Sequence, residues 1–562
     1  MISETINTDV LVVGGGLAGC QAAVKAKTED NNVLLVDKGY VSRSGQTVFA
    51  AGALNICLPE DDKDVWMREI VERGEYLNDQ EWVKIQLERG YPLLMELDEW
   101  VRGYGYAILE RDERGNLIRK KARGNINTRT CVINAIPAMN TMRRKLLEQK
   151  VSLLERVMVT DLVMEDGRVA GAIGLGYRDG KVYLFRAKSV VLAAAGCGFK
   201  SFFIGHRNLT GEGQAMAYEA GAVLRNLDQA MSNTTARALD IHGLSLMVGL
   251  GGKFLNSQGE EFMWNYDPEV GSRARLTRVT VGIAREVAAG RGPVYMDLTG
   301  VAEEDQKLLK KILPEGFKAF ASMNIDPFKQ KVEWMPAFEG TLAHGGGIHI
   351  DTACASNVPG LFSAGDNTCT PEHGTWSVTG LNLTFCVVSG DIAGRSAASY
   401  AKEAPAPRFT RKDVGEKVAR IRAPLDARKG PSADEVIYSI QEAIIPYDVA
   451  YIRTDESLLR ALGKIESIRD EAVPSISARN PHELVKALEA RSMACVAEMV
   501  VRSALFRKES RGFVYKPDYP LTDNDEWLKW IMVGRDGDGM KVWAESFPTP
   551  YVQAPAGKYP PR

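Results

Sequence analysis

The sequence carries little net charge and no long hydrophobic run. Its 70 Lys and Arg residues nearly balance 72 Asp and Glu residues, which leaves a formal charge of −2. This balance gives no reason to expect binding to nucleic acid or to a charged membrane surface. No apolar stretch approaches the roughly 18 residues that span a bilayer, so we expect no transmembrane segment. The chain goes directly into its first apolar strand without a signal-peptide pattern, so we expect a cytoplasmic protein.

Cysteine and histidine are scarce, and neither forms a ligand cluster. The 8 cysteines are scattered without a Cys-x-x-Cys pair, so we expect no iron–sulfur cluster in this chain. The 6 histidines lack the spacing of a zinc site, so we expect no bound metal. The composition, with 45% hydrophobic and 25% charged residues, is that of a globular protein with a large core. Its length indicates roughly two or three domains.

The most informative pattern is a glycine-rich turn between two apolar runs. The first run ends in Gly-x-Gly-x-x-Gly at residues 14–19, a helical stretch follows, and the second run closes at Asp37. Gly14 permits a tight turn, Gly16 lets a pyrophosphate approach the backbone, and Gly19 lets the helix pack on the sheet. The helix N-terminus offers N–H groups to phosphates, and Asp37 can bind a ribose. The pattern predicts a dinucleotide site; the alternative is a purely structural glycine turn.

Four further segments favour FAD as the dinucleotide. The loop 41–55 is rich in small and hydroxylated residues and suits a large planar ligand, although it also fits a Ser/Gly-rich surface loop. A buried strand runs into small residues at 189–198, and residues 208–222 have the pattern of a turn that caps a tightly packed helix. The strand at 360–366 ends in Gly-Asp, which can contact the ribityl and pyrophosphate groups of a flavin dinucleotide.

Together these motifs resemble the flavoprotein subunits of succinate dehydrogenase, fumarate reductase, L-aspartate oxidase and adenylylsulfate reductase. The resemblance covers nearly the whole chain, and segments 505–513 and 517–520 are similar to the Arg-Glu-Ser-Arg-Gly and Asp-Tyr-Pro signatures of that family. It implies an α/β fold with a Rossmann-type FAD-binding domain, an inserted α+β capping domain and a C-terminal helical domain. We place the FAD-binding domain at residues 1–229 and 341–404, the capping domain at 230–340 and the helical domain at 405–562.

Departures from the family pattern bear on the cofactor link and the substrate. The respiratory members carry Arg-Ser-His-Thr, whose His is bonded to FAD, whereas residues 43–47 read Arg-Ser-Gly-Gln-Thr. The resemblance therefore implies non-covalent FAD. Leu342 and Ser377 stand where the dicarboxylate enzymes of the family have a His and an Arg. A C4-dicarboxylate needs paired cationic donors, so we expect fumarate to be disfavoured as the substrate.

The adenylylsulfate reductase branch is more similar in several places. Residues 288–297 are close to its Ala-Gly-Arg-Gly-Pro-Ile-Tyr-Met stretch, and Arg237 falls where that branch has a substrate-binding Arg. Asn55 and His373 match its Asn and its active-site His. The residues after Arg237 depart from the aromatic and basic run of that branch. We therefore interpret the chain as a relative of this branch whose substrate stays open.

The resemblance also implies candidate catalytic residues. Arg278 is the first choice, because the family has an Arg proton donor in this part of its capping domain; Arg273 and Arg275 are alternatives. An Arg stays protonated, so it would act mainly as an electrostatic anchor near the flavin. His344 could replace the displaced family His by a shift of register. Each of these residues also has a structural or surface alternative. The full catalytic set is Arg278, His373, Arg237 and Asn55.

The predicted cofactor contacts lie in the glycine-rich turn, the loop after Asp37 and the small-residue segments. They are Gly14, Gly16, Leu17, Ala18, Gly19, Asp37, Lys38, Ser44, Gly45, Gln46, Thr47, Ala51, Gly52, Ala195, Gly196, Thr210, Gly211, Gly213, Gly365, Asp366, Asn382 and Leu383.

These observations predict an FAD-dependent oxidoreductase subunit that acts on a small anionic substrate. The resemblance implies a route for electrons, and since this chain has no cluster ligands, any iron–sulfur clusters on that route would lie in a second, ferredoxin-like subunit, which makes a hetero-oligomer the expectation. One chemistry is that of adenylylsulfate and sulfite. The alternative is hydride transfer to an activated double bond of a carboxylate or thioester. A different class is an electron-relay subunit of a larger complex.

Local patterns also predict single elements. Residues 160–171 alternate apolar and polar residues around Glu-Asp-Gly, which indicates a hairpin. A helix is expected over 303–312, a linker at 404–407 and an amphipathic helix over 481–508. The tail with Trp527, Trp530 and Tyr551 could pack on this chain or on a neighbouring one.

Overall fold

The computed structural model describes residues 2–50, 52–121, 125–202, 205–239 and 245–561. Its first sheet holds the predicted dinucleotide unit. β1 (Glu4–Val13) pairs in parallel with β2 (Val33–Asp37) and with β8 (Val182–Leu192), while β2 pairs with β5 (Ser152–Glu155) and β8 with β15 (Leu361–Ser363). The buried runs of β1 and β8 are apolar on both faces, as parallel strands covered by helices must be.

An antiparallel hairpin extends this sheet beyond β8. β7 (Arg168–Gly176) pairs with β8 and with β6 (Val157–Glu165), so the order of the path is β5-β2-β1-β8-β7-β6. Asp166 and Gly167 form the turn, both with positive φ, which suits a tight hairpin whose twist matches the strands. The hairpin predicted from the Glu-Asp-Gly pattern is therefore confirmed.

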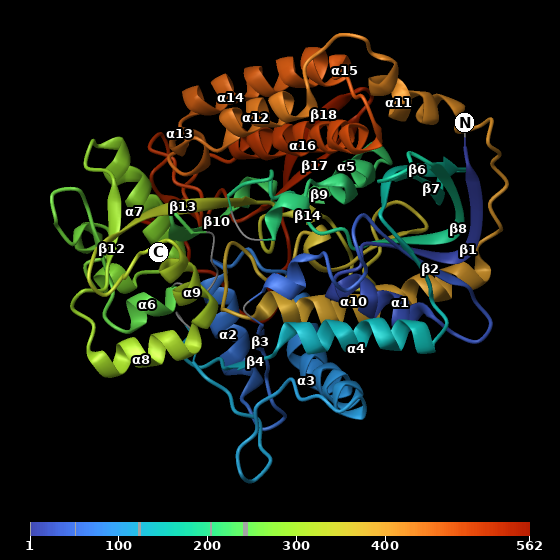
Figure 1. The fold of residues 1–562 in the computed structure, drawn as a ribbon. Coiled ribbons are helices and arrows are strands. Elements are labelled where there is room, and N and C mark those ends of the chain that lie inside the picture. The colour runs from blue at the N-terminus through green and yellow to red at the C-terminus, as the bar shows by residue number, and fades with distance from the viewer. Residues whose placement is uncertain (1, 51, 122–124, 203–204, 240–244, 562) are drawn as a thin grey trace.

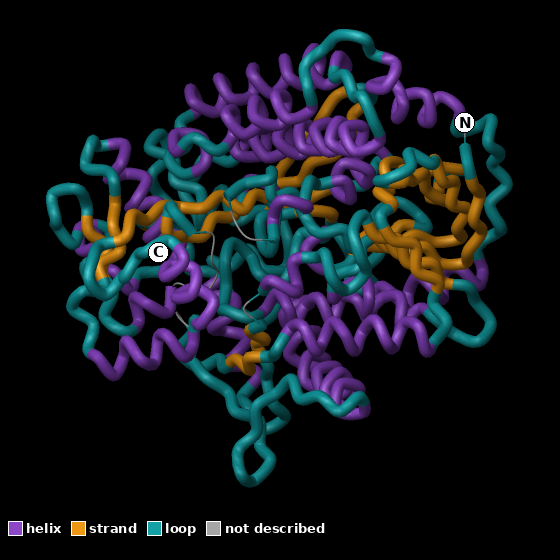
Figure 2. The backbone as a smooth tube through the Cα atoms, viewed as in Figure 1, coloured by secondary structure: helices purple, strands orange, loops and turns teal. Residues whose placement is uncertain are grey.

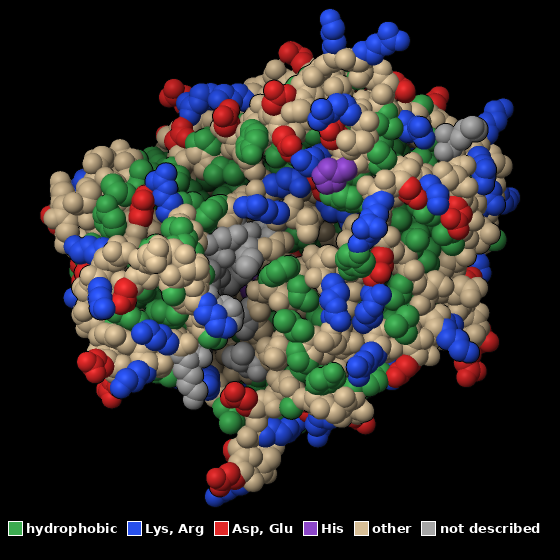
Figure 3. Space-filling model, in the orientation of Figure 1, with side chains coloured by type: hydrophobic (Ala, Val, Ile, Leu, Met, Phe, Trp, Pro, Cys, Tyr) green, Lys and Arg blue, Asp and Glu red, His purple; other side chains and the backbone are tan. Residues whose placement is uncertain are grey.

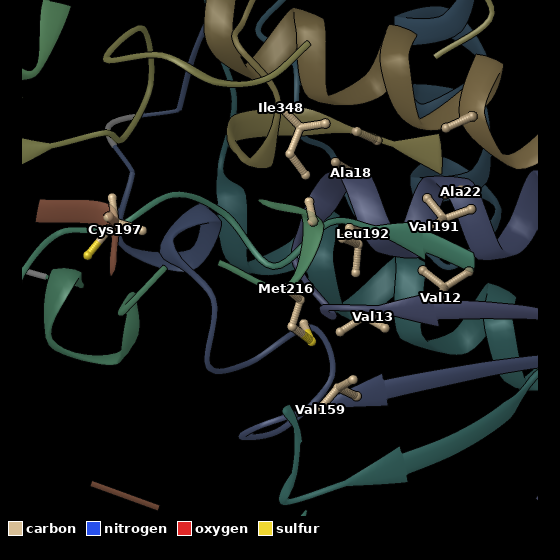
Figure 4. Close-up of a cluster of buried hydrophobic side chains, with 14 of the residues drawn as sticks. Val12, Val13, Ala18, Ala22, Val159, Val191, Leu192, Cys197, Met216 and Ile348 are labelled. Atoms are coloured by element: carbon tan, nitrogen blue, oxygen red, sulfur yellow. The ribbon is translucent and has the colours of Figure 1, made fainter. Parts of the chain in front are cut away.

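Helices are stacked in layers on one side of the first sheet (Figures 1 and 2). The strands contact α1 (Leu17–Ala26) and α10 (Leu381–Glu403). Outside them, α4 (Ala135–Glu148) packs on α1, α3 (Gln80–Gly103) packs on α10, and α2 (Lys63–Arg73) packs on α3. α1 and α10 pack closely, since a Cβ on Gly394 would lie 2.2 Å from the Ala22 carbonyl oxygen. Figure 4 shows Ala22 of α1 in the same core as Val12 of β1 and Val191 of β8. A small ribbon of β3 (Ala53–Asn55) and β4 (Thr130–Val132) lies beside these helices.

A second sheet forms a separate body at the left of Figure 1. Its order is β10-β13-β12-β11, with β10 (Met231–Ala236), β13 (Val332–Gly340), β12 (Val294–Asp297) and β11 (Lys253–Leu255), all antiparallel. It has its own hydrophobic cluster around Phe254, Met296 and Trp334. The helices are α6 (Ser245–Gly249), α7 (Leu276–Ala288), α8 (Glu303–Ile312) and α9 (Pro314–Ser322). The helix expected at 303–312 is present as α8.

The C-terminal part begins as helices and ends as strands. Its helices are α11 (Gly415–Asp426), α12 (Ala433–Ile444), α13 (Tyr447–Ala450), α14 (Asp455–Ser467), α15 (Val473–Ser475) and α16 (Pro481–Phe506). The helix predicted for 481–508 is present as α16, but its predicted amphipathic character was wrong. α16 is buried on most of its surface, with Leu484, Glu489 and Met493 all inaccessible, because α12 and α14 cover one side and α5 (Glu212–Glu219) another.

The strands after α16 return to the part of the chain that follows the first sheet. β17 (Trp530–Asp536) pairs with β18 (Gly539–Glu545) and with β9 (Leu224–Arg225), which in turn pairs with β14 (Gly347–Ile348). β16 (Thr522–Asp523) pairs with β19 (Lys558–Tyr559). The tail packs on this chain: Trp530 Nε1 donates to Leu77 O at 3.0 Å, and Tyr551 N donates to Gln80 Oε1 at 2.9 Å.

Candidate active site

A cavity of about 450 Å³ lies at the carboxyl ends of β1, β2 and β8. This is the edge at which parallel α/β sheets bind nucleotides. Gly14 leaves β1 with φ of +106°, and a Cβ there would lie 2.2 Å from Ala193 O, so only glycine fits the turn. At Gly16 the nearest atom to an added Cβ is Thr47 Oγ1 at 3.8 Å. That opening is the cradle that a pyrophosphate needs next to the N-terminus of α1.

Asp37 closes the other side of the glycine turn. Its Oδ2 accepts a hydrogen bond from Gly15 N and its Oδ1 accepts one from Gly39 N, both at 2.6 Å. Burial raises the pKa of Asp37, and the two backbone donors oppose that shift. Each carboxylate oxygen still has lone-pair capacity for a further donor, which a ribose hydroxyl would supply.

Twelve of the predicted cofactor residues line the cavity: Gly14, Gly16, Leu17, Ala18, Asp37, Lys38, Ser44, Gly45, Gln46, Thr47, Ala195 and Asp366. The lining also holds residues that the sequence did not point to, such as Tyr40, Arg156, Met158, Tyr177 and Met216. Several of these come from β6 and the turn after β7. The sequence predicted the hairpin but gave no signal that it faces the ligand.

The other predicted contacts within the described residues are not part of the cavity lining. Gly19, Gly196, Gly213 and Gly365 allow close packing, since a Cβ on each would clash with a neighbouring segment. Gly211 caps α5, Thr210 Oγ1 accepts from Lys38 Nζ at 3.0 Å, and Gly52 accepts from Ile133 N. Asn382 and Leu383 lie in the first turn of α10. Ala51 lies outside the described residues.

Two buried imidazoles lie next to the loop after β15. The rings of His344 and His373 are 4.8 Å apart between centroids, and Phe513 stacks on His344 at 5.9 Å. None of the four ring nitrogens has a geometric hydrogen-bond partner among the described residues. Burial lowers the pKa of His373 to about 3 and holds that of His344 well below its usual value, while the Asn382 amide opposes both shifts. Both imidazoles are therefore neutral.

Carboxyl groups surround this histidine pair. Asp366 lines the cavity and accepts from Asn382 Nδ2 at 2.7 Å, and burial raises its pKa to about 6. Glu372 Oε1 is 3.8 Å from His373 Nε2, and burial raises the pKa of Glu372 well above its usual value. The imidazoles thus offer neutral donors and acceptors, and Asn382 and Asp366 join them to the cavity.

The arginine that reaches this loop is Arg275 rather than Arg278. Arg275 precedes α7, and its Nη2 donates to Arg73 O at 2.5 Å and to Trp376 O at 3.4 Å. Arg278 lies one turn further along, where its guanidinium donates to Tyr266 O at 2.5 Å and to Pro561 O at 2.6 Å. Arg275 is the N-cap of α7 with an extended backbone, whereas Arg278 lies in the first helical turn, so the two side chains leave the backbone in different directions.

Of the two remaining catalytic candidates, Arg237 lies away from the histidine pair and Asn55 lies beside α10. Arg237 pairs with Glu333 at 2.7 Å and its side chain is 68% exposed, so the structure does not bring it to the histidine pair. Asn55 is buried in β3; its N–H donates to Gly380 O, and Nδ2 has no partner among the described residues. It therefore stands beside the N-terminus of α10, with an amide free for a ligand.

The described residues contain no group of His, Cys, Asp and Glu side chains that could hold a metal ion, and all the cysteines are free thiols. No helix in the described part of the chain is long and apolar enough to cross a membrane. On the face shown in Figure 3, basic and acidic side chains are interspersed with hydrophobic ones, in line with the small net charge.

Comparison with known proteins agrees with this geometry. The family model for the FAD binding domain matches residues 9–383, and the model for the fumarate reductase flavoprotein C-terminus matches residues 441–559. The open cradle at Gly16, the Asp37 carboxylate and the unpartnered Asn55 amide fit FAD. The protein is therefore an FAD-dependent oxidoreductase. Within that class the chain belongs to the succinate dehydrogenase and fumarate reductase flavoprotein family.

Relatives match over nearly their full length. One subunit of the CoM/CoB fumarate reductase of Methanothermobacter marburgensis is 31% identical, over 95% of this chain and 98% of that protein. The fumarate reductase flavoprotein subunit of Mycobacterium tuberculosis is 28% identical, over 95% and 96%. Among solved structures, E. coli quinol fumarate reductase has a TM-score of 0.87 at 23% identity, over 98% of each chain. Adenylylsulfate reductase of Archaeoglobus fulgidus has a TM-score of 0.79 at 23% identity, over 98% and 97%. These structures establish the fold.

Proposed function

We propose that this flavoprotein reduces a carbon–carbon double bond conjugated to a carboxylate or thioester of a small substrate by adding a hydride and a proton, or forms that double bond by removing both from the saturated compound. The observation that carries the proposal is the buried pair of His344 and His373, whose ring nitrogens lie near the Asn382 amide but make no hydrogen bond of regular geometry among the described residues. Buried polar groups without partners are costly, so they are expected to serve a ligand. The names of the relatives, fumarate reductase above all, support this chemistry.

Residues around the pair have distinct roles in this proposal. FAD, when bound, supplies or accepts the hydride. Arg275 stays protonated and attracts the carboxylate or carbonyl oxygen of the substrate, which orients the double bond. The neutral imidazole of His373 donates one N–H to the same group without adding charge. Asn382, at the N-terminus of α10, joins this site to the cofactor cavity through Asp366.

The substrate is expected to carry one carboxylate or thioester rather than two carboxylates. Leu342 is fully buried, and Ser377 Oγ donates to Ile70 O at 2.7 Å, so neither provides the cation that family members have there. A second carboxylate would lack a charge-assisted partner, and such hydrogen bonds are about twice as strong as neutral ones. Fumarate itself should therefore bind weakly.

An iron–sulfur subunit of the ferredoxin type is the proposed electron partner. The thiols of this chain are free, and no described cluster of side chains could hold a metal. The related proteins are named as subunits, which is consistent with a second polypeptide. A pure relay subunit would not need Arg275 and His373 beside the flavin, so substitutions there would leave electron flow intact.

Adenylylsulfate chemistry is the second candidate, supported by the fold similarity and by His373. Arg237 is exposed and paired with Glu333, so adenylylsulfate chemistry has less support than the resemblance alone would give it.

One experiment separates these candidates. The purified protein is reduced anaerobically and mixed with crotonate, a crotonyl thioester or fumarate, and its flavin absorbance is followed. We expect reoxidation by the first two. Arg275→Gln should slow it by about 100- to 1,000-fold, the cost of removing one preorganised donor. Arg278→Gln on the same helix is the matched control and should stay within about tenfold of wild type.

The oxidised protein is then titrated with sulfite, with and without AMP. Bleaching of the flavin band by sulfite that AMP strengthens, together with no reoxidation by any unsaturated acid, would replace the double-bond proposal with adenylylsulfate chemistry. Equal losses in the two arginine variants would remove the role assigned to Arg275.

A further inference from the structure

Four charged side chains meet beside the Asp37 end of the cavity. Lys38 Nζ donates to Glu212 Oε1 at 2.8 Å, to Glu489 Oε1 at 2.9 Å and to Thr210 Oγ1 at 3.0 Å. Lys200 Nζ pairs with Glu489 Oε2 at 2.8 Å. The charges alternate as Glu212, Lys38, Glu489 and Lys200, and we call this set the Lys38 cluster.

The Lys38 cluster joins the two parts of the chain that the family models match. Lys38 follows β2, Lys200 lies in the loop after β8, and Glu212 opens α5, all within residues 9–383. Glu489 lies in the buried helix α16, within residues 441–559. The C-terminal part of the chain therefore supplies one member of a charge cluster on the wall of the FAD cavity, which Lys38 and Glu212 line.

The cluster is buried and its charges cancel. The side chains of Glu489, Glu212 and Lys38 are only 3%, 8% and 19% exposed. Burial alone would lower the pKa of Lys38, but the carboxylates of Glu212 and Glu489 outweigh it and raise that pKa. Burial would raise the pKa of Glu489, but Lys38 and Lys200 hold it below its usual value. Two ammonium groups thus neutralise two carboxylates.

An ammonium group has three N–H donors, and all three on Lys38 are engaged. Lys38 therefore has no donor left for a phosphate, although it lines the cavity. Its neighbour Asp37 holds Gly15 N and Gly39 N and has the geometry to bind a ribose. The side chain of Lys38 is anchored on α16, and its backbone carries the turn that shapes this end of the cavity.

We propose that Glu489 is a positioning residue for FAD: by holding Lys38 it fixes the turn at residues 37–40 in the shape that binds the cofactor. Removing one partner from a buried ion cluster leaves an uncompensated charge, and the remaining groups move to regain solvent or new partners. The turn then loses the contact that ties it to α16 and keeps only Glu212 and Thr210, so affinity for FAD falls even though Glu489 does not line the cavity.

A purely electrostatic role for Glu489 predicts the opposite change in FAD affinity. If Glu489 only neutralised Lys38, the Glu489→Gln variant would free an N–H donor and add one positive charge next to the diphosphate of FAD. The cofactor would then bind more tightly. The two readings are separated by the direction of the change in FAD affinity.

The test is a titration of the apoprotein with FAD, followed by flavin fluorescence. We expect Glu489→Gln to weaken FAD binding at least about tenfold, or about 1.4 kcal/mol. Adding Lys200→Gln removes the surplus positive charge, and the double variant should return to within about threefold of wild type. Two separate packing defects would add instead of cancelling. Lys486→Gln is the control: this residue lies one turn away on α16 in a more exposed pair with Asp434, and its variant should bind FAD normally.

Each other outcome counts against the proposal. Unchanged or tighter FAD binding by Glu489→Gln would overturn it, and so would a double variant weaker than the single one. Circular dichroism of the apoproteins checks folding. If Glu489→Gln does not fold, the double variant decides, because restored charge balance should restore both folding and FAD binding. A double variant that is also unfolded would refute the proposal.

Discussion

Replacing Glu509 with glutamine removes the charge at the centre of a fully buried ion cluster. Glu509 Oε1 accepts from Arg507 Nη1 and from Arg511 Nε, both at 2.7 Å, and Oε2 accepts from Arg511 Nη2 at 2.9 Å. All three side chains have 0% exposure. Glutamine keeps the volume, but it turns one acceptor into an NH₂ group that faces guanidinium donors.

The expected loss of unfolding free energy follows from the hydrogen-bond partners that each arginine keeps in the variant. Breaking a buried ion pair by removing one partner costs about 3–5 kcal/mol. Arg507 keeps the Asp228 carboxylate at 2.5 Å, whereas Arg511 keeps only neutral acceptors, the Glu75 carbonyl and the Asn524 amide. Because one of the two cations remains paired, we expect a loss near the lower limit, about 3 kcal/mol of unfolding free energy.

Denaturant unfolding of the FAD-bound protein measures this loss. Tryptophan fluorescence and circular dichroism are recorded together, because a chain with several domains need not unfold in one step. Asp166→Asn is the control: its pair with Arg408 is 70–78% exposed and is worth about 0–1 kcal/mol, and Asn tolerates the positive φ of that turn. A loss below about 1 kcal/mol for Glu509→Gln, equal to the control, would refute the reasoning about buried charge.

Two more predictions concern the cofactor turn and the body built on β10–β13. Gly14→Ala should give protein purified without flavin, because the added Cβ would lie 2.2 Å from Ala193 O at a φ of +106°; a normal ratio of flavin to protein absorbance would contradict this. Glu286→Gln should remove an acid-sensitive step in thermal unfolding. Hydrogen bonding to Arg291 lowers the pKa of Glu286 to about 2 from a usual 4.5, so the stabilisation is complete above pH 4.5 and is lost as pH falls toward 2. A wild-type protein with the same acid dependence as the variant would count against it.

Patterns that act within a short stretch were predictable from the sequence. The glycine turn needs only neighbouring residues, and so does the Asp166-Gly167 hairpin. α8 begins and ends where its acidic first turn and apolar spacing indicate. These elements follow from local backbone and side-chain preferences, which can be read from the sequence of each segment alone.

Features that depend on distant segments were not predictable. β17 pairs with β9, and the sequence of neither strand indicates that the other is its partner. Likewise, a lysine next to Asp37 looks like a phosphate ligand until Glu489 is brought to it from a helix 451 residues away. The choice between Arg275 and Arg278 depended on where α7 begins and on which distant carbonyl groups each guanidinium meets, Trp376 O for Arg275 and Tyr266 O for Arg278. The histidine pair needed the fold to bring two loops together.

The position of Glu489 also sets an order of events during synthesis. Lys38 and Glu489 are separated by 451 residues, so at translation rates of about 5–20 residues per second Lys38 leaves the ribosome roughly 20–90 s before its partner. During that interval the nascent nucleotide domain holds an ammonium group without its full set of carboxylates. If Glu489 positions the cofactor turn as proposed, tight binding of FAD has to wait until α16 has been made.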